Sequence, residues 1–407
     1  MHNLLKVSGL VLIFVVLRSG IAVSQSTSSP YSIFGLGLIE GNSLGPSKAM
    51  GGTGIAFLSD KWINIANPAS YSGLDSLLSI FEIGLFGKYT AYSSNDGNQS
   101  SVDANFKYVV MGFRITPWLA TSFGFTPYSK IGYNINTKAD VEGSNMKYNK
   151  RFSGEGGINR TYLGTSLKVT KNIALGINAS YLFGNITQNE FSETYYYLLS
   201  DVTYMSNLHL NYGLTYKFAV KENMFNIGLI YGNSKTLRTR NITTILTDYE
   251  SEVIENKSKK FRIPRNYGLG LAYEREYFKA GFDFERNVWK DIKFENSKIR
   301  TRNSDRYSVG IEFPSQGPNK GTNRMLFYRV GAEYQGSYFI INNTPINYYA
   351  VTLGAGIPLK GVLSAVNISL ELGQNGIKKK DLFRENFVSL HLDLSLRDLW
   401  FIKRRYL

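Results

Sequence analysis

Alternation of apolar and polar residues with a period of two is the feature that most constrains this chain. Between residues 388 and 397, five apolar side chains alternate with Ser389, His391, Asp393, Ser395 and Arg397. Such a segment is a strand with one apolar and one polar face. We count about fourteen such segments, with centres near residues 83, 109, 123, 167, 177, 210, 227, 269, 282, 309, 330, 351, 368 and 392.

Many of these segments reach ten residues, which is the length of a tilted strand that crosses a bilayer. A water-soluble sandwich also alternates, but its strands have about five or six residues. Short and long connections alternate along the chain. Tight turns at 116–118, 170–172 and 221–223 follow every second strand, and long polar segments such as 131–160 and 232–262 lie between them. The pattern predicts an all-β chain that forms an antiparallel transmembrane β-barrel of about fourteen strands, closed by its first and last strands.

The N-terminus has the pattern of an export signal. Lys6 precedes an apolar run at 7–17, and small residues at 22–24 provide a cleavage site. We therefore expect a signal peptide at residues 1–24, and a barrel at residues 76–407 in the outer membrane of a Gram-negative bacterium, with both mature termini periplasmic. Trp118 and Trp400 are expected at the periplasmic aromatic girdle.

Residues 25–75 have no alternation of this length and are rich in Gly and Pro. Glycine permits positive φ and close backbone approach, which suits a compact segment inside a narrow space. We therefore predict an N-terminal hatch, or plug, inside the barrel. Its motif residues are Gly51, Gly52, Gly54, Asn67, Pro68 and Ala69.

The segments 49–54 and 67–69, followed by about fourteen strands, resemble the FadL-type outer-membrane transporters of hydrophobic compounds (the OMPP1/FadL/TodX-like group). The segments 30–37, 154–160 and 400–405 resemble a Bacteroidota branch of that group. The resemblance implies a hatch, a pocket for a long apolar ligand such as a long-chain fatty acid, and passive release through a gap in the wall. The same group includes barrels similar to the PorV component of type IX secretion, so a scaffold that docks proteins at its extracellular loops is the alternative.

Pro127 marks the candidate for that gap. Proline cannot donate a hydrogen bond to a strand ladder and is confined to edges and bulges, so Gly124, Pro127 and Tyr128 are the expected kink. In FadL-type proteins the third strand carries such a kink. The alternative is that Pro127 ends the strand near the loop rim.

The chain has 46 Lys and Arg against 31 Asp and Glu, which favours anionic partners. Export makes nucleic acid an unsuitable partner. We predict loops that face lipopolysaccharide, carrying Lys147, Lys150, Arg151, Lys257, Lys259 and Lys260, with a merely solvated surface as the alternative.

The composition excludes several chemistries. The chain has no cysteine and three histidines, so thiolate sites, a lipoprotein anchor and a multi-histidine metal site are not expected, and we predict no cofactor and no metal. Ser389, His391 and Asp393 share a strand face, which raises an outer-membrane lipase as a third choice. Successive residues on one face are about 6.5 Å apart, too far for most Ser–His hydrogen bonds, so we do not predict an enzyme.

Overall fold

The computed structural model describes residues 29–407 except positions 77, 96, 142, 144, 257–258, 277, 291–298, 316–325, 360–363, 380–381 and 400–407. The expected signal peptide, together with Trp400 and Lys257, lies outside the described residues.

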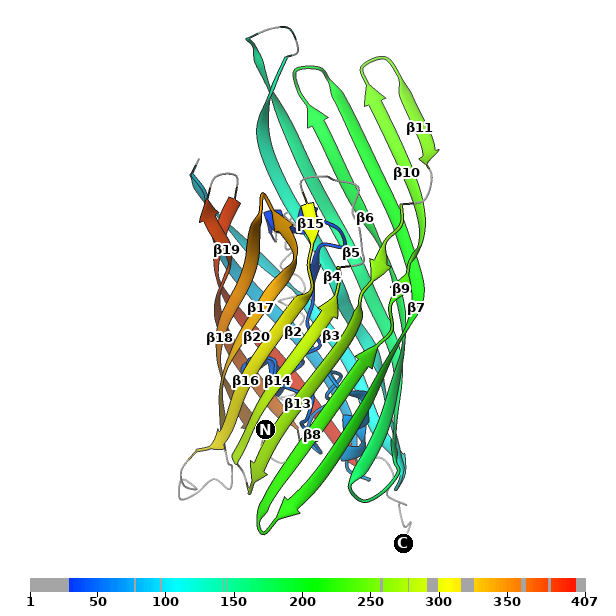
Figure 1. The fold of residues 1–407 in the computed structure, drawn as a ribbon, viewed down its shortest axis with the longest axis vertical. Coiled ribbons are helices and arrows are strands. Elements are labelled where there is room, and N and C mark those ends of the chain that lie inside the picture. The colour runs from blue at the N-terminus through cyan, green and yellow to red at the C-terminus, as the bar shows by residue number, and fades with distance from the viewer. Residues whose placement is uncertain are drawn as a thin grey trace, which may run out of the picture.

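Fourteen antiparallel strands form a closed transmembrane β-barrel (Figure 1). Each strand pairs with the next along the chain, and β20 pairs with β2 to close the ring. The strands are β2 (Leu78–Ser93), β3 (Asn98–Thr116), β4 (Leu119–Asp140), β5 (Lys147–Lys168), β6 (Ile173–Ser192), β7 (Tyr197–Val220), β8 (Asn223–Gly232), β13 (Arg265–Arg275), β14 (Phe278–Val288), β16 (Ser304–Pro314), β17 (Phe327–Ile341), β18 (Thr344–Pro358), β19 (Ala365–Lys379) and β20 (Leu382–Leu399). The predicted strand count is confirmed, and every predicted centre lies within its strand.

The alternating residues of each barrel strand form an apolar outer face and a polar inner face. On β20, Leu390 and Leu392 are 52% and 45% exposed, whereas Ser389, His391 and Asp393 are buried on the inner face. Exposed Leu, Val, Phe and Tyr side chains recur on the other strands. An apolar outer surface of this kind is stable in lipid, where the closed ladder leaves no edge to solvate.

The turns at 116–118, 170–172, 221–223 and 274–276 are short, as expected, whereas the long polar segments differ from expectation. β4 and β5 extend so far that most of 131–160 is strand rather than loop. The segment 232–262 likewise carries β9 (Lys235–Thr236), β10 (Arg238–Thr247), β11 (Ser251–Asn256) and the start of β12 (Arg262–Ile263), and β15 (Ile299–Thr301) pairs with β17. These extensions lack an apolar outer face, because a strand beyond the bilayer has no lipid-facing side, although Ile131 and Tyr133 of β4 are buried on the inner face.

The N-terminal segment has little regular structure: η1 (Pro30–Ile33), β1 (Leu38–Ile39), α2 (Pro46–Ala49) and η2 (Pro68–Gly73). It packs against inward-facing glycines of the strands: a Cβ on Gly310 would lie 2.4 Å from Met50, and one on Gly228 would lie 2.0 Å from the Ile55 carbonyl oxygen. Figure 1 shows this segment in blue among the strands. Among the described residues, no helix is long and apolar enough to cross a membrane.

Candidate functional site

The barrel wall is interrupted between β3 and β4. Their ladder runs from the pair Thr116–Leu119 to the pair Val109–Phe125. Beyond that point β3 continues against β2 as far as Asn98, and β4 continues against β5 as far as Asp140. On its other side β4 pairs through Ser129 and Lys130 with the short strand β1 instead of with β3. The two strands therefore separate beyond the pair Val109–Phe125.

The local sequence explains why β4 leaves β3. Pro127 pairs with Asn159 and Ser129 with Ile158, so Tyr128 is the extra residue of a β-bulge. Bulges bend the strand that carries them, and proline offers no N–H to a neighbouring strand. On β5, Gly156 and Gly157 face the bulged region with φ of +103° and +144°, a conformation that favours glycine. The structure thus places Pro127 and Tyr128 at a bend rather than at a strand end, and Gly124 on the last paired stretch below it.

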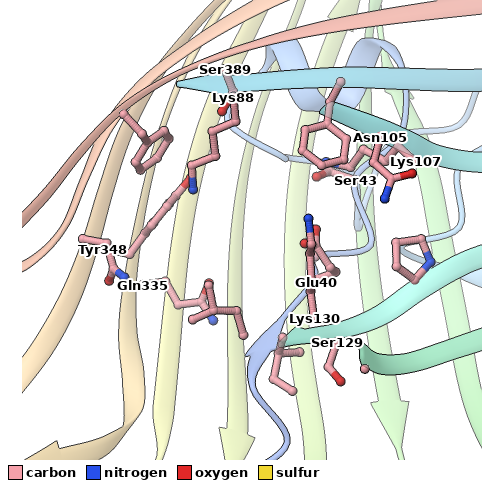
Figure 2. Close-up of a pocket in the computed structure, with 18 of the residues that line it drawn as sticks. Glu40, Ser43, Lys88, Asn105, Lys107, Ser129, Lys130, Gln335, Tyr348 and Ser389 are labelled. Atoms are coloured by element: carbon pink, nitrogen blue, oxygen red, sulfur yellow. The ribbon is translucent and has the colours of Figure 1, made fainter. Parts of the chain in front are cut away.

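A cavity of about 510 Å³ lies behind the separation. Phe106 and Lys107 of β3 and Phe125 and Pro127 of β4 line it at the interruption. Aromatic side chains supply much of its surface; they are Phe86, Phe106, Phe125, Tyr338, Phe339, Tyr348 and Phe387. Figure 2 shows lysines from several strands and Glu40 of the N-terminal segment around this space.

Ion pairs surround the cavity and one of them crosses the interruption. Lys130 of β4 contacts Asp103 of β3, which joins the two strands by side chains where their backbones do not pair. Lys48 of α2 contacts Glu371 of β19 at 2.7 Å, and Glu371 also accepts a hydrogen bond from Tyr348. Burial disfavours the charged form of Lys48, but Glu371 and Glu333 outweigh that effect and raise the pKa of Lys48 above its usual value.

The glycine part of the predicted hatch motif contacts the inner wall through its backbone. The Gly51 N–H donates to Thr352 Oγ1 at 2.8 Å, and the Gly54 N–H donates to Asp283 Oδ2 at 2.6 Å. Arg306 donates to the carbonyl oxygens of Gly51 and Gly52 at 3.2 and 3.1 Å. Gly51 and Gly52 have φ of +65° and +77°, so this turn favours glycine.

The second part of the motif begins η2. The Asn67 side chain accepts from the Ala69 N–H at 3.0 Å and donates to the Leu214 carbonyl of β7 at 3.1 Å. Pro68 occupies the first helical position, where a missing N–H costs nothing. Cβ atoms at Gly213 and Gly176 would meet Asn67 and Ala69. All six motif residues are therefore in contact with the wall.

The Ser–His–Asp set on β20 does not form a hydrogen-bonded triad. His391 Nε2 lies 3.3 Å from Glu371 Oε2, and Asp393 accepts from the Tyr108 hydroxyl at 2.7 Å. Among the described residues, no group of three or more His, Asp or Glu side chains is arranged to hold a metal ion.

The predicted basic loops are divided among different elements. Lys147, Lys150 and Arg151 lie on β5 rather than in a loop, and Lys150 pairs with Glu190 at 2.5 Å. Lys259, which contacts Asp201, and Lys260 follow β11. The sequence did not single out Lys88 and Lys107 as site residues; Lys88 lies at an inward position of β2, where a polar residue fits the alternation and gives no separate signal.

The BamG family model matches residues 6–407 of this chain. The chain belongs to the BamG family. The comparison with curated proteins finds no match.

Among solved structures, this BamG-family chain resembles the toluene transporter TodX of P. putida, with a TM-score of 0.61, 14% identity, and 89% of this chain and 100% of TodX covered. It also resembles the toluene transporter TbuX of Ralstonia pickettii (TM-score 0.58, 13% identity, 88% and 98% covered). The monoaromatic hydrocarbon channel CymD gives a TM-score of 0.56 at 15% identity, with 88% and 99% covered. The expected likeness to FadL-type barrels is confirmed at the level of the fold.

Proposed function

We propose that this protein is a passive transporter of hydrophobic small molecules in the outer membrane of a Gram-negative bacterium. The observation that carries the proposal is the interruption between β3 and β4, with an aromatic-lined cavity directly behind it. An apolar solute in that cavity can leave sideways into the hydrocarbon of the bilayer without passing through water. The fold shared with TodX, TbuX and CymD, whose names describe hydrocarbon transport, supports the same function.

Residues 25–75 act in this proposal as a hatch. Its glycine motif donates to Thr352 and Asp283 and accepts from Arg306, and these hydrogen bonds hold it against the inner wall. A segment held across the lumen obstructs a straight aqueous path and leaves the lateral route for an apolar ligand. Long-chain fatty acids are one ligand class for this route, and the resemblance to a Bacteroidota branch stays a prediction.

The orientation completes the proposal. The short turns face the periplasm together with both mature termini, and the tall strands face outward. Lys147, Lys150, Arg151, Lys259 and Lys260 then lie toward the phosphates of lipopolysaccharide, which attract cations, and Lys257 belongs to the same proposed basic surface by its place in the sequence.

Removal of the bulge tests the lateral route. The change Pro127→Val with deletion of Tyr128 restores a regular β4, which can then pair with β3 and close the interruption. We expect cells that express this variant to take up the neutral fluorescent probe N-phenyl-1-naphthylamine no faster than cells without the protein. Tyr128→Phe keeps the bulge and is the matched control, with uptake close to that of the wild type. Equal uptake by the deletion variant and the wild type would contradict the lateral route.

A docking scaffold is a second candidate, and one observation favours it. Beyond the barrel, β7 continues against β10, and β10 pairs with β11. In the described part of the chain β11 pairs with β10 alone, which leaves one side of this strand available to a strand of another protein. Tyr249, in the connection between β10 and β11, is 95% exposed. A stable complex that forms through β11 in cells, together with normal uptake by the bulge-deleted variant, would favour this function over transport.

A further inference from the structure

Two lysines in the cavity have no carboxylate partner. Lys88 of β2 and Lys107 of β3 both line the cavity, and among the described residues neither ammonium group has a carboxylate oxygen within 4.0 Å. Both ammonium groups lie over aromatic rings: Lys88 Nζ lies 4.2 Å from the ring centroid of Phe387, and Lys107 Nζ lies 5.8 Å from that of Phe86. A partly buried ammonium group without an acceptor is costly unless a ligand supplies one.

The fold directs Lys107 to this place. Gly84 pairs with Tyr108 and Leu85 pairs with Phe106, so Lys107 is the extra residue of a second bulge. A bulge re-aims the side chain of its extra residue, and here that side chain reaches the cavity, as Figure 2 shows. A regular strand would place alternate residues on the lipid face, where an ammonium group is unstable.

The carboxylates of the cavity already have partners of their own in three of four cases. Glu371 contacts Lys48, and Glu333 accepts from Arg306 at 2.7 Å. Glu385 accepts from Ser29 at 2.5 Å and from Asn375 at 3.0 Å. Glu40 is the fourth, and it lines the same cavity on the N-terminal segment. Glu40, Glu371 and Asp393 attract Lys107, and Glu385 attracts Lys88, but among the described residues none of them forms an ion pair with these lysines within 4.0 Å. Both ammonium groups therefore keep donors for an anion from outside.

We propose that the cavity binds an aromatic anion, a carboxylate or sulfonate whose oxygens contact Lys88 and Lys107 and whose ring packs among Phe86, Phe387 and Phe106. The inference deepens the proposed function, on which it rests, by naming the ligand class. A neutral hydrocarbon would leave both ammonium groups without an acceptor. Charge-assisted hydrogen bonds to two lysines favour the anion, and the seven aromatic side chains of the cavity favour a ring over an alkyl chain.

Two probes that differ by one group test the charge. The full-length protein in lipid nanodiscs is titrated with 8-anilino-1-naphthalenesulfonate and with the neutral N-phenyl-1-naphthylamine, and the signal of empty nanodiscs is subtracted. We expect the wild type to bind the sulfonate at least about tenfold more tightly than the neutral probe. Lys107→Met and Lys88→Met should each lower this affinity ratio severalfold, and Lys107→Arg should retain it. Lys61→Met is the control, because Lys61 also lies over a phenylalanine ring, at 5.3 Å from Phe327, but outside the cavity.

The outcomes separate the inference from the proposed function. Equal affinity for both probes, or a ratio that neither lysine variant lowers, would overturn the inference and leave the transport of neutral compounds standing. Failure of the wild type to bind either probe would overturn both. Competition by 1-octanesulfonate that equals competition by 1-naphthalenesulfonate would overturn the choice of an aromatic ligand. Each variant is first checked for the heat-dependent shift in gel mobility that a folded barrel shows.

Discussion

Two halves of the barrel use glycine in different ways. Along β13 to β18 the ladder is continuous, and inward glycines such as Gly310 and Gly331 give room for the N-terminal segment to lie directly on the strands. Along β3 to β6 the ladder is interrupted, and Gly156 and Gly157 adopt positive φ where the wall bends. Both regions hold the N-terminal segment, since Gly176 of β6 also lies against it, but only the β3–β4 region leaves a gap in the ladder beside the cavity.

The largest expected effect is in the continuous half. A Cβ on Gly331 would lie 2.2 Å from the Gly51 nitrogen and the Met50 carbonyl carbon, which are backbone atoms that cannot turn aside. We expect Gly331→Val to displace the N-terminal segment and to lower the free energy of unfolding by about 3 kcal/mol. Thermal unfolding in detergent measures the loss, and proteolysis of residues 45–56 measures the displacement.

Gly87→Val is the control for that change, because a Cβ at Gly87 has no atom within 4 Å among the described residues. Its unfolding temperature should stay close to that of the wild type. A similar loss of stability in both variants would mean that valine disturbs the strands themselves. The close contact between Gly331 and the N-terminal segment would then not be the cause of the loss.

The interrupted half gives a smaller expected effect. Gly157 has φ of +144°, and its Cβ would lie 2.3 Å from the Ser129 carbonyl oxygen on β4. Gly157→Ala should therefore cost about 1–3 kcal/mol of stability and reduce uptake of N-phenyl-1-naphthylamine, since β5 can no longer follow the bend. Gly143→Ala has a comparable backbone strain, with φ of +80°, but a Cβ there has no atom of the described residues within 4 Å. A larger loss in Gly143→Ala would show that the contact with β4 is unimportant.

The comparison also explains what the sequence could predict. The membrane-spanning strands were predictable, because lipid on one side and a packed lumen on the other impose alternation on residues such as 388–397. The extensions of β4 and β5 were not, since their outer faces have no lipid to impose alternation, although Ile131 and Tyr133 are buried on the inner face. Pro127 signalled the bend, whereas the bulge at Lys107 has no proline or glycine to mark it and depends on the register between β2 and β3.

The smallest expected effect concerns pH at the contact between the N-terminal segment and the wall. Carboxylates raise the pKa of Lys48 above the ordinary lysine value of about 10.4. The ion pair of Lys48 with Glu371 therefore contributes its full stability below that ordinary value. The contribution is lost only as the pH rises through the raised pKa of Lys48. Between pH 7 and pH 9 we expect this pair to contribute no change in unfolding temperature. Lys48→Arg keeps the charge at every pH in that range and provides the comparison. If the wild type lost stability between pH 7 and pH 9 while Lys48→Arg did not, Lys48 would be titrating there. Mild alkali would then release the N-terminal segment from β19 at its contact with Glu371.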